Sequence, residues 1–94
     1  MRLPRAVLVG PHSYKIVKMK RLKQLGTCNY DTGRLSLQTG MLLSKEQEVV
    51  LHEVLHACGY PTLCGKDEEF VDTIAPSLLQ VLRDNPSLVE YLTK

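Results

Sequence analysis

The feature that most constrains the fold of this chain is a change in the spacing of its apolar residues near residue 40. Before that point polar and apolar side chains alternate, which is the period of a half-buried β-strand. Residues 13–19 and 34–38 show this alternation clearly, and residues 25–30 form a weaker candidate strand. Turn-forming residues 31–33 join the last two candidates, so they are predicted to form a hairpin.

Beyond residue 43 the apolar residues recur at helical spacing instead. Ser44 and Gln47 form a capping box, so a helix is predicted to begin at Ser44. Gly59, followed by Pro61, is expected to end this helix. Its apolar stripe should face the core, and it consists of Val50, Leu51, Val54, Leu55 and Cys58.

A second helix is predicted from about Asp67 to Arg83, and Pro76 inside it indicates either a kink or a later start. The residues expected to face inward are Val71, Ile74, Ala75, Leu78, Leu79 and Leu82. Asn85 and Pro86 then predict a short last helix that ends near Leu92.

Strands followed by helices predict an α+β fold. We expect a small antiparallel or mixed sheet of about three strands, packed on the helix that begins at Ser44 and followed by one or two C-terminal helices. The length of 94 residues is that of a single domain, so residues 1–94 are expected to form one unit.

The composition argues against several classes of protein. No apolar run approaches the roughly 20 residues that span a bilayer, so a membrane partner is not expected. The apolar stretch at residues 6–9 is too short for a secretory signal. The three cysteines are odd in number and contain no C-x-x-C pair, which favours free thiols in a reducing compartment. We therefore expect a cytoplasmic protein.

Charge is divided unevenly along the chain. Residues 1–43 contain eight Lys or Arg and one acidic residue, a net charge of +7, whereas residues 44–94 contain four and nine, a net charge of −5. We interpret the basic half as a solvated face of the sheet. The alternative is a basic rim that attracts an acidic partner or nucleic acid. Tyr14 and Tyr30 are its only aromatic residues, so stacking of bases is poorly supported and nucleic acid is not the expected partner.

The pentapeptide His52-Glu53-Val54-Leu55-His56 predicts a metal site on the first predicted helix. Residues four apart lie on one face of a helix, so His52 and His56 can bind the same ion. Zn²⁺ suits imidazole ligands and leaves a position open for water. Glu53 is then expected to be the general base that takes a proton from this water and passes it to a leaving amine. The alternative is that the two histidines share a helix by chance.

A catalytic zinc site needs a third protein ligand. Glu68, in the first turn of the second predicted helix, is our prediction, with Glu69 as its rival and Cys64 as a less favoured alternative. Asp72 lies four residues after Glu68 and is expected to accept a hydrogen bond from a ligating imidazole. Alternatively, residues 67–69 only complement the dipole of the helix.

The sequence contains few candidates for stabilising a transition state or binding a substrate. His12 and Tyr60 are the two that could donate a hydrogen bond to an oxyanion. An extended peptide can add to an unpaired sheet edge through main-chain hydrogen bonds. Residues 35–38 are the candidate edge strand, and an internal position for them is the equal alternative.

Residues 49–57, which include the pentapeptide, resemble the active-site helix of the zincin metallopeptidases. Glu68 followed by Asp72 is similar to the third-ligand helix of the gluzincin branch, and residues 74–79 resemble the corresponding helix of ImmA/IrrE-type peptidases. The resemblance implies bound zinc, a sheet packed on the active-site helix, and hydrolysis of peptide bonds in a peptide or protein substrate.

Residues 9–14 and 83–86 extend the resemblance to nearly the whole chain, which looks like the minimal zincin-like proteins of tailed bacteriophages and prophages. For a phage-encoded protein this implies the cytoplasm of the host cell. Only 11 residues separate His56 from Glu68, fewer than in large gluzincins, and a C-terminal helical domain is not expected. These two differences from large gluzincins favour a narrow or conditional substrate range.

Two other functions fit part of the pattern. In so small a core, zinc could supply much of the folding free energy of a non-catalytic binding module. Residues 52–60 also resemble the metal helix of YbeY-type endoribonucleases, but that family expects a third histidine where residues 61–64 are Pro-Thr-Leu-Cys. That family also lacks a glutamate after the first histidine. We therefore expect a zinc metallopeptidase first and a metal-dependent ribonuclease last.

Overall fold

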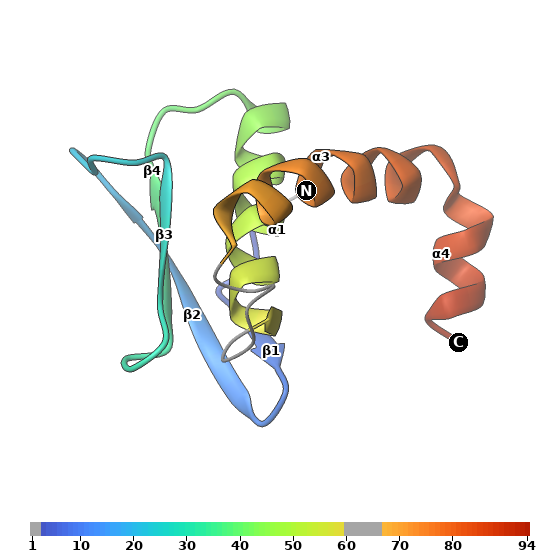
Figure 1. The fold of residues 1–94 in the computed structure, drawn as a ribbon, viewed down its shortest axis with the longest axis horizontal. Helices are drawn as coiled ribbons and strands as arrows, with labels where there is room; N and C mark the ends of the chain where they lie inside the picture. Colours follow the sequence, from blue (N-terminus) through green and yellow to red (C-terminus); the bar gives the residue numbers. More distant parts are fainter. Residues whose placement is uncertain (1–2, 60–66) are drawn as a thin grey trace.

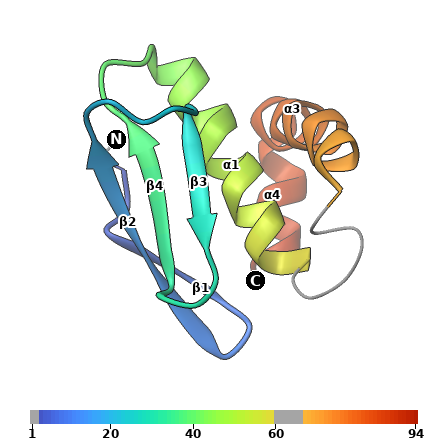
Figure 2. The ribbon, with the colours of Figure 1, turned by 60° about the vertical axis from the view of Figure 1, so that its left-hand side comes forward.

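The computed structural model describes residues 3–59 and 67–94. They form four strands, β1 (Ala6–Val9), β2 (His12–Met19), β3 (Gly26–Asn29) and β4 (Arg34–Gln38), and then the helices α1 (Leu43–Gly59), α3 (Glu68–Asp84) and α4 (Pro86–Leu92). Helix α1 lies between the sheet and α3 (Figure 1 and Figure 2). The predicted α+β class, with a small sheet followed by C-terminal helices, is confirmed.

The strands form one mixed sheet in the order β1-β2-β4-β3. β2 and β4 are parallel, and the two outer pairs, β1 with β2 and β3 with β4, are antiparallel. The hairpin predicted for residues 25–38 is therefore present. Its turn begins at Asn29, whose side-chain oxygen accepts hydrogen bonds from the backbone N–H groups of Asp31 and Thr32. The turn closes at Gly33, whose φ of 65° is a conformation that glycine adopts without strain.

Two predictions about the sheet need correction. The sequence pattern did not indicate β1, because its four residues are too few for a clear alternation and two of them are exposed. Of the two equal alternatives for residues 35–38, the edge position is wrong and the internal position is confirmed, because β4 pairs with β2 on one side and with β3 on the other. Among the strands of the described residues, the free edge on that side of the sheet belongs to β3.

The predicted start of α1 is wrong by one residue. The helix begins at Leu43, and the backbone carbonyl of Leu42 accepts the N–H of Glu46 at 2.8 Å. Ser44 therefore lies inside the first turn and does not cap the helix. The helix extends to Gly59, the residue predicted to end it.

The core lies between the sheet and α1. In β2, Tyr14 and Ile16 are buried and alternate with exposed residues on the opposite face, as the period of a β-strand requires. In the central strand β4, Ser36 on the opposite face is buried as well. The buried core residues are Tyr14, Ile16, Leu35 and Leu37 from the sheet and Val49 and Ala57 from α1. Burial of Val49 and Ala57 determines which side of α1 faces the sheet.

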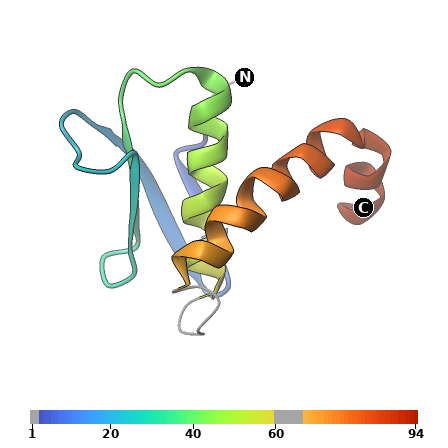
Figure 3. The same ribbon diagram turned by 45° about the horizontal axis from the view of Figure 1, so that its top comes forward.

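Helix α3 packs on the other side of α1. Its N-cap is Asp67, whose carboxylate accepts the backbone N–H of Phe70 at 3.1 Å. Val71 and Ala75 are fully buried, and the helix continues through Pro76, so a later start is excluded. The C-terminal part of α3 and α4 extend away from the sheet (Figure 3). Among the described residues, no helix combines the length and apolar character that crossing a bilayer requires.

Candidate functional site

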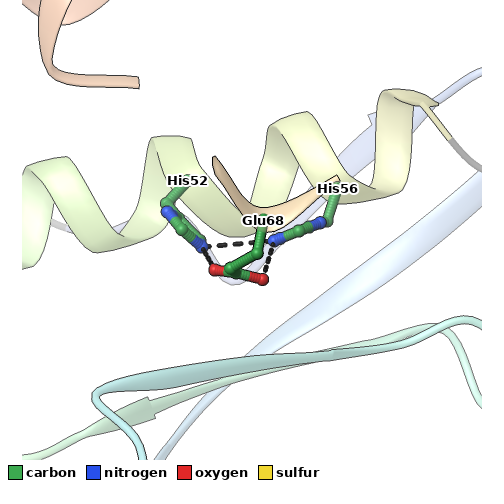
Figure 4. Close-up of side chains that lie close together, drawn as sticks. All are labelled: His52, His56 and Glu68. Atoms are coloured by element: carbon green, nitrogen blue, oxygen red, sulfur yellow. Dashed lines mark hydrogen bonds and ion pairs between the residues drawn. The ribbon is translucent and has the colours of Figure 1, made fainter. Parts of the chain in front are cut away.

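Three side chains converge between α1 and the beginning of α3: His52, His56 and Glu68. The Glu68 carboxylate lies between the two imidazoles (Figure 4), with Oε1 2.7 Å from His52 Nε2 and Oε2 3.1 Å from His56 Nε2. The two Nε2 atoms are 3.2 Å apart. The structure thus brings together one nitrogen from each histidine and both oxygens of one carboxylate.

Helical spacing explains how these groups meet. Val49, Glu53 and Ala57 are spaced four residues apart on α1 and lie on the side that faces the sheet. His52 and His56 each precede one of these residues, so they lie on the adjacent side of the helix, which faces α3. On α3, Glu68 precedes the buried Val71 and Ala75 by three and seven residues, which places it on the side that packs on α1.

This donor set could hold a metal ion, and two imidazoles with a carboxylate are ligands that zinc accepts. Two histidines and a carboxylate leave a fourth position open in a tetrahedral site. Bonds of about 2.0–2.1 Å in such a site place neighbouring ligand atoms roughly 3.3 Å apart. The 3.2 Å between the two Nε2 atoms is close to this value. The 2.7 and 3.1 Å distances join the nitrogens to different oxygens of Glu68 and have the length of hydrogen bonds or ion pairs. His52, His56 and Glu68 are therefore the residues that would hold the ion.

Asp72 supports one of the histidines from the next turn of α3. Its Oδ1 atom lies 3.3 Å from Nδ1 of His52, the ring nitrogen that does not face Glu68. An acceptor at Nδ1 favours the tautomer in which that nitrogen carries the proton and Nε2 presents a lone pair. Asp72 thus orients His52 with Nε2 directed at the cluster.

Glu53 lies beside the cluster but is not part of it. Its side chain is 7% exposed, and its Oε2 atom is 3.9 Å from His52 Nε2. Burial raises the pKa of Glu53, and the imidazoles of His52 and His56 oppose this shift. A buried carboxylate next to three potential metal ligands has the position and the chemistry of a proton carrier.

The edge strand β3 approaches Glu53 closely. A Cβ atom at Gly26 would lie 2.6 Å from Cγ1 of Val49, 3.1 Å from Cγ of Glu53 and 3.2 Å from its Oε2, so no larger residue fits without a shift of its neighbours. A groove of about 830 Å³ runs along this junction, lined by residues 24–28 on one side and by α1 and α3 on the other. The free edge of β3 and the histidine cluster therefore border the same groove.

The other predicted site residues are placed as follows. Glu69 is exposed and does not belong to the cluster, although it is the neighbour of Glu68. His12 is exposed at the beginning of β2 and does not line the groove. Tyr60 and Cys64 lie outside the described residues. Cys58 was expected to face the core, but it is an exposed free thiol.

Sequence reasoning missed two groove residues, Tyr30 and Cys28. Tyr30 directly follows β3, is half-buried and lines the groove with Glu53. Burial raises the pKa of the Tyr30 phenol, and the nearby groups Cys28 and Glu53 add to the effect, so the phenol stays a hydrogen-bond donor at neutral pH. Burial, and secondarily the charge of Glu53, raises the pKa of Cys28 to about 11. No local pattern marks either residue, because their proximity to the site depends on the position of β3 at the sheet edge.

Comparisons with protein families, curated proteins and solved structures found no match for this chain.

Proposed function

We propose that this protein is a zinc-dependent peptidase. The observation that carries the proposal is the position of Glu53, a buried carboxylate 3.9 Å from a histidine of the His52, His56 and Glu68 cluster and next to a free strand edge. Zinc held by these three residues would polarise a water molecule and the carbonyl of a peptide bond. The resemblance to the zincin metallopeptidases supports the same assignment.

The protein's own groups have distinct tasks in this proposal. Glu53 accepts the proton of the attacking water and returns it to the nitrogen that leaves. Asp72 keeps His52 in the ligating orientation through the 3.3 Å contact. The Tyr30 phenol, which lines the groove with Glu53, is a further candidate for stabilising negative charge on the carbonyl oxygen, the role for which His12 and Tyr60 were the candidates.

Substrate binding follows from the free edge of β3. An extended peptide can pair with this edge through main-chain hydrogen bonds, which bind a backbone whatever its side chains. Because Gly26 has no side chain, a peptide on this edge passes close to Glu53. Only 11 residues separate His56 from Glu68, and this short connection favours a narrow substrate range. We place the activity in the cytoplasm, since Cys28 and Cys58 are free thiols.

The test combines metal analysis with hydrolysis of a peptide library. The wild type should contain about one zinc per chain and cleave some member of the library in a chelator-sensitive reaction. Glu53→Gln should keep the zinc but lose activity by about 10²-fold or more. Glu68→Gln should lose zinc to a weak chelator, and the matched variant Glu69→Gln should keep both zinc and activity. Equal hydrolysis, or none, by the wild type and Glu53→Gln with zinc bound would contradict the proposal.

A second candidate, a zinc-stabilised binding module, is favoured by the thin packing of α3. Only two residues of this helix are fully buried, and the cluster joins it to α1. Zinc could therefore supply much of the free energy that holds α3 in place. This alternative expects that chelation detaches or unfolds α3, and that Glu53→Gln has no effect on any function of the protein.

A further inference from the structure

A positively charged loop borders one end of the groove. Residues 20–25, here called the basic loop, connect β2 to β3 beside the N-terminal end of α1 (Figure 2). Its basic residues are all exposed, and they are Lys20, Arg21 and Lys23. All ten acidic residues of the chain lie in the described part, and none of them forms an ion pair with these three. Nearby Lys18 and Lys45, in contrast, pair with Glu46 and Glu48.

Hydrogen bonds hold the basic loop in a defined conformation. The backbone N–H of Leu22 donates to Oε1 of Gln38 at 2.7 Å, and the N–H of Gln38 donates to the carbonyl of Leu25 at 2.9 Å. Arg21 has a φ of 63°, in the left-handed region that residues other than glycine rarely adopt. The strained backbone and its anchors keep the cationic residues at the end of the sheet.

The loop is also close to the point where a peptide would be cleaved. Gln24 and Leu25 line the groove, and β3 begins at Gly26, where an added Cβ would lie 3.1 Å from Cγ of Glu53. A strand rises about 3.3 Å per residue, so the basic loop lies roughly two to four residues along an extended peptide from the bond beside Glu53. β3 runs away from the loop, and a peptide paired antiparallel with β3 would run towards it.

We propose that the basic loop selects substrates with acidic side chains about two to four residues to the C-terminal side of the cleaved bond. This inference rests on the proposed function, because it concerns the same groove. The charges around the groove are asymmetric: the basic loop that borders it is cationic and forms no ion pair with an acidic residue of the chain, whereas the start of α3 is acidic. Complementary charge attracts an acidic flank to the loop and repels one placed beside α3.

Fluorescence anisotropy with three labelled peptides of one sequence tests the inference. One peptide has glutamates in the C-terminal flank, one has them in the N-terminal flank, and one has glutamines at both places. The protein is zinc-loaded Glu53→Gln, so that binding is measured without turnover, and wild-type hydrolysis of the same peptides is followed separately. The C-terminal glutamate peptide should bind about fivefold more tightly than the glutamine peptide at low salt, and the difference should shrink at 0.5 M salt.

Two double variants with the same net charge locate the effect. Lys20→Gln with Lys23→Gln should reduce the fivefold preference to less than about twofold. Lys15→Gln with Arg34→Gln removes two cations that lie opposite each other on the exposed face of the sheet, away from α1, and should leave the preference unchanged.

The outcomes separate this inference from the proposed function. Hydrolysis without any flank preference, or an equal loss of preference in both double variants, overturns the inference and leaves the peptidase standing. A preference that depends on Lys20 and Lys23 without hydrolysis of any peptide supports the loop as an acidic-peptide site and counts against the peptidase. Binding of a short RNA that requires these lysines, with peptide binding unaffected by their loss, would also overturn the inference.

Discussion

Replacing Gly26 by alanine perturbs the contact between the edge strand and the site. The new Cβ would lie 2.6 Å from Cγ1 of Val49, whereas ordinary contacts are 3.4–4 Å. Val49 is only 7% exposed, and a valine in a helix has little freedom to rotate, so the clash must be relieved by moving β3 or α1. Overpacking of this kind costs about 1–3 kcal/mol. For a domain of this size, each kcal/mol lowers Tm by about 4–8 °C.

Urea and thermal unfolding would measure the cost, and a double-mutant cycle would locate it. Val49→Ala removes Cγ1, so the loss of stability caused by Gly26→Ala should be smaller in the Val49→Ala background, with a coupling of roughly 1 kcal/mol. The 3.1 Å approach to Cγ of Glu53 persists in the double variant, so hydrolysis should recover less than stability does. Zinc binding should survive throughout, because all three ligands are on helices.

Gly10 provides the control for this cycle. A Cβ atom at Gly10 would meet nothing within 4 Å, although its φ of 59° makes alanine strained there. Gly10→Ala should therefore destabilise the protein independently of Val49→Ala, and the two effects should add. If Gly26→Ala were as stable as the wild type, or if its effect simply added to that of Val49→Ala, the close approach of β3 to α1 would be refuted.

Three further predictions concern the supports of the site. Asp72→Asn should weaken zinc affinity about 10- to 100-fold in competition with a chromophoric chelator, and unchanged affinity would mean that the contact with Nδ1 of His52 has no role. Asp67→Ala removes the N-cap of α3 and should lower the free energy of unfolding by about 1 kcal/mol; a change near zero in urea would rule out the cap. The pKa of Cys28 in the folded state is about 11, above its ordinary value of 9.0, so the thiolate is disfavoured by folding. The free energy of unfolding should fall as the pH rises from 9 to 11, and Cys28→Ala should reduce this fall, whereas identical pH profiles would contradict it.

Local signals accounted for most of the secondary structure. The turn at residues 31–33 and the alternation on either side predicted the β3–β4 hairpin, because both are properties of adjacent residues. The first strand escaped prediction because Ala6–Val9 is short, and its structure depends on pairing with β2. The predicted start of α1 was wrong by one residue, because Ser44 resembles a capping residue although the helix already begins at Leu43.

The sequence likewise predicted one part of the candidate site, and the tertiary structure decided the other. The pairing of His52 and His56 and the neighbouring carboxylate of Glu53 are consequences of helical spacing, so the sequence alone predicts them. The choice between Glu68 and Glu69 depends on the rotation of α3 about its axis. Burial of Val71 and Ala75 against α1 sets this rotation and places Glu68 beside the imidazoles.

By itself, the sequence determined that strands precede helices, that one helix contains the His/Glu/His motif, and that charge is asymmetric, since each depends on neighbouring residues or on composition. It did not reveal β1. Only the tertiary structure decided that β3 rather than β4 is the edge strand, that Gly26 contacts Glu53, and that Tyr30 and the basic loop border the groove. The physical reason is the parallel pairing of β2 with β4. This pairing inserts β4 between β2 and β3, which follow one another in the chain, and leaves β3 at the edge of the sheet. No pattern of adjacent residues encodes this arrangement.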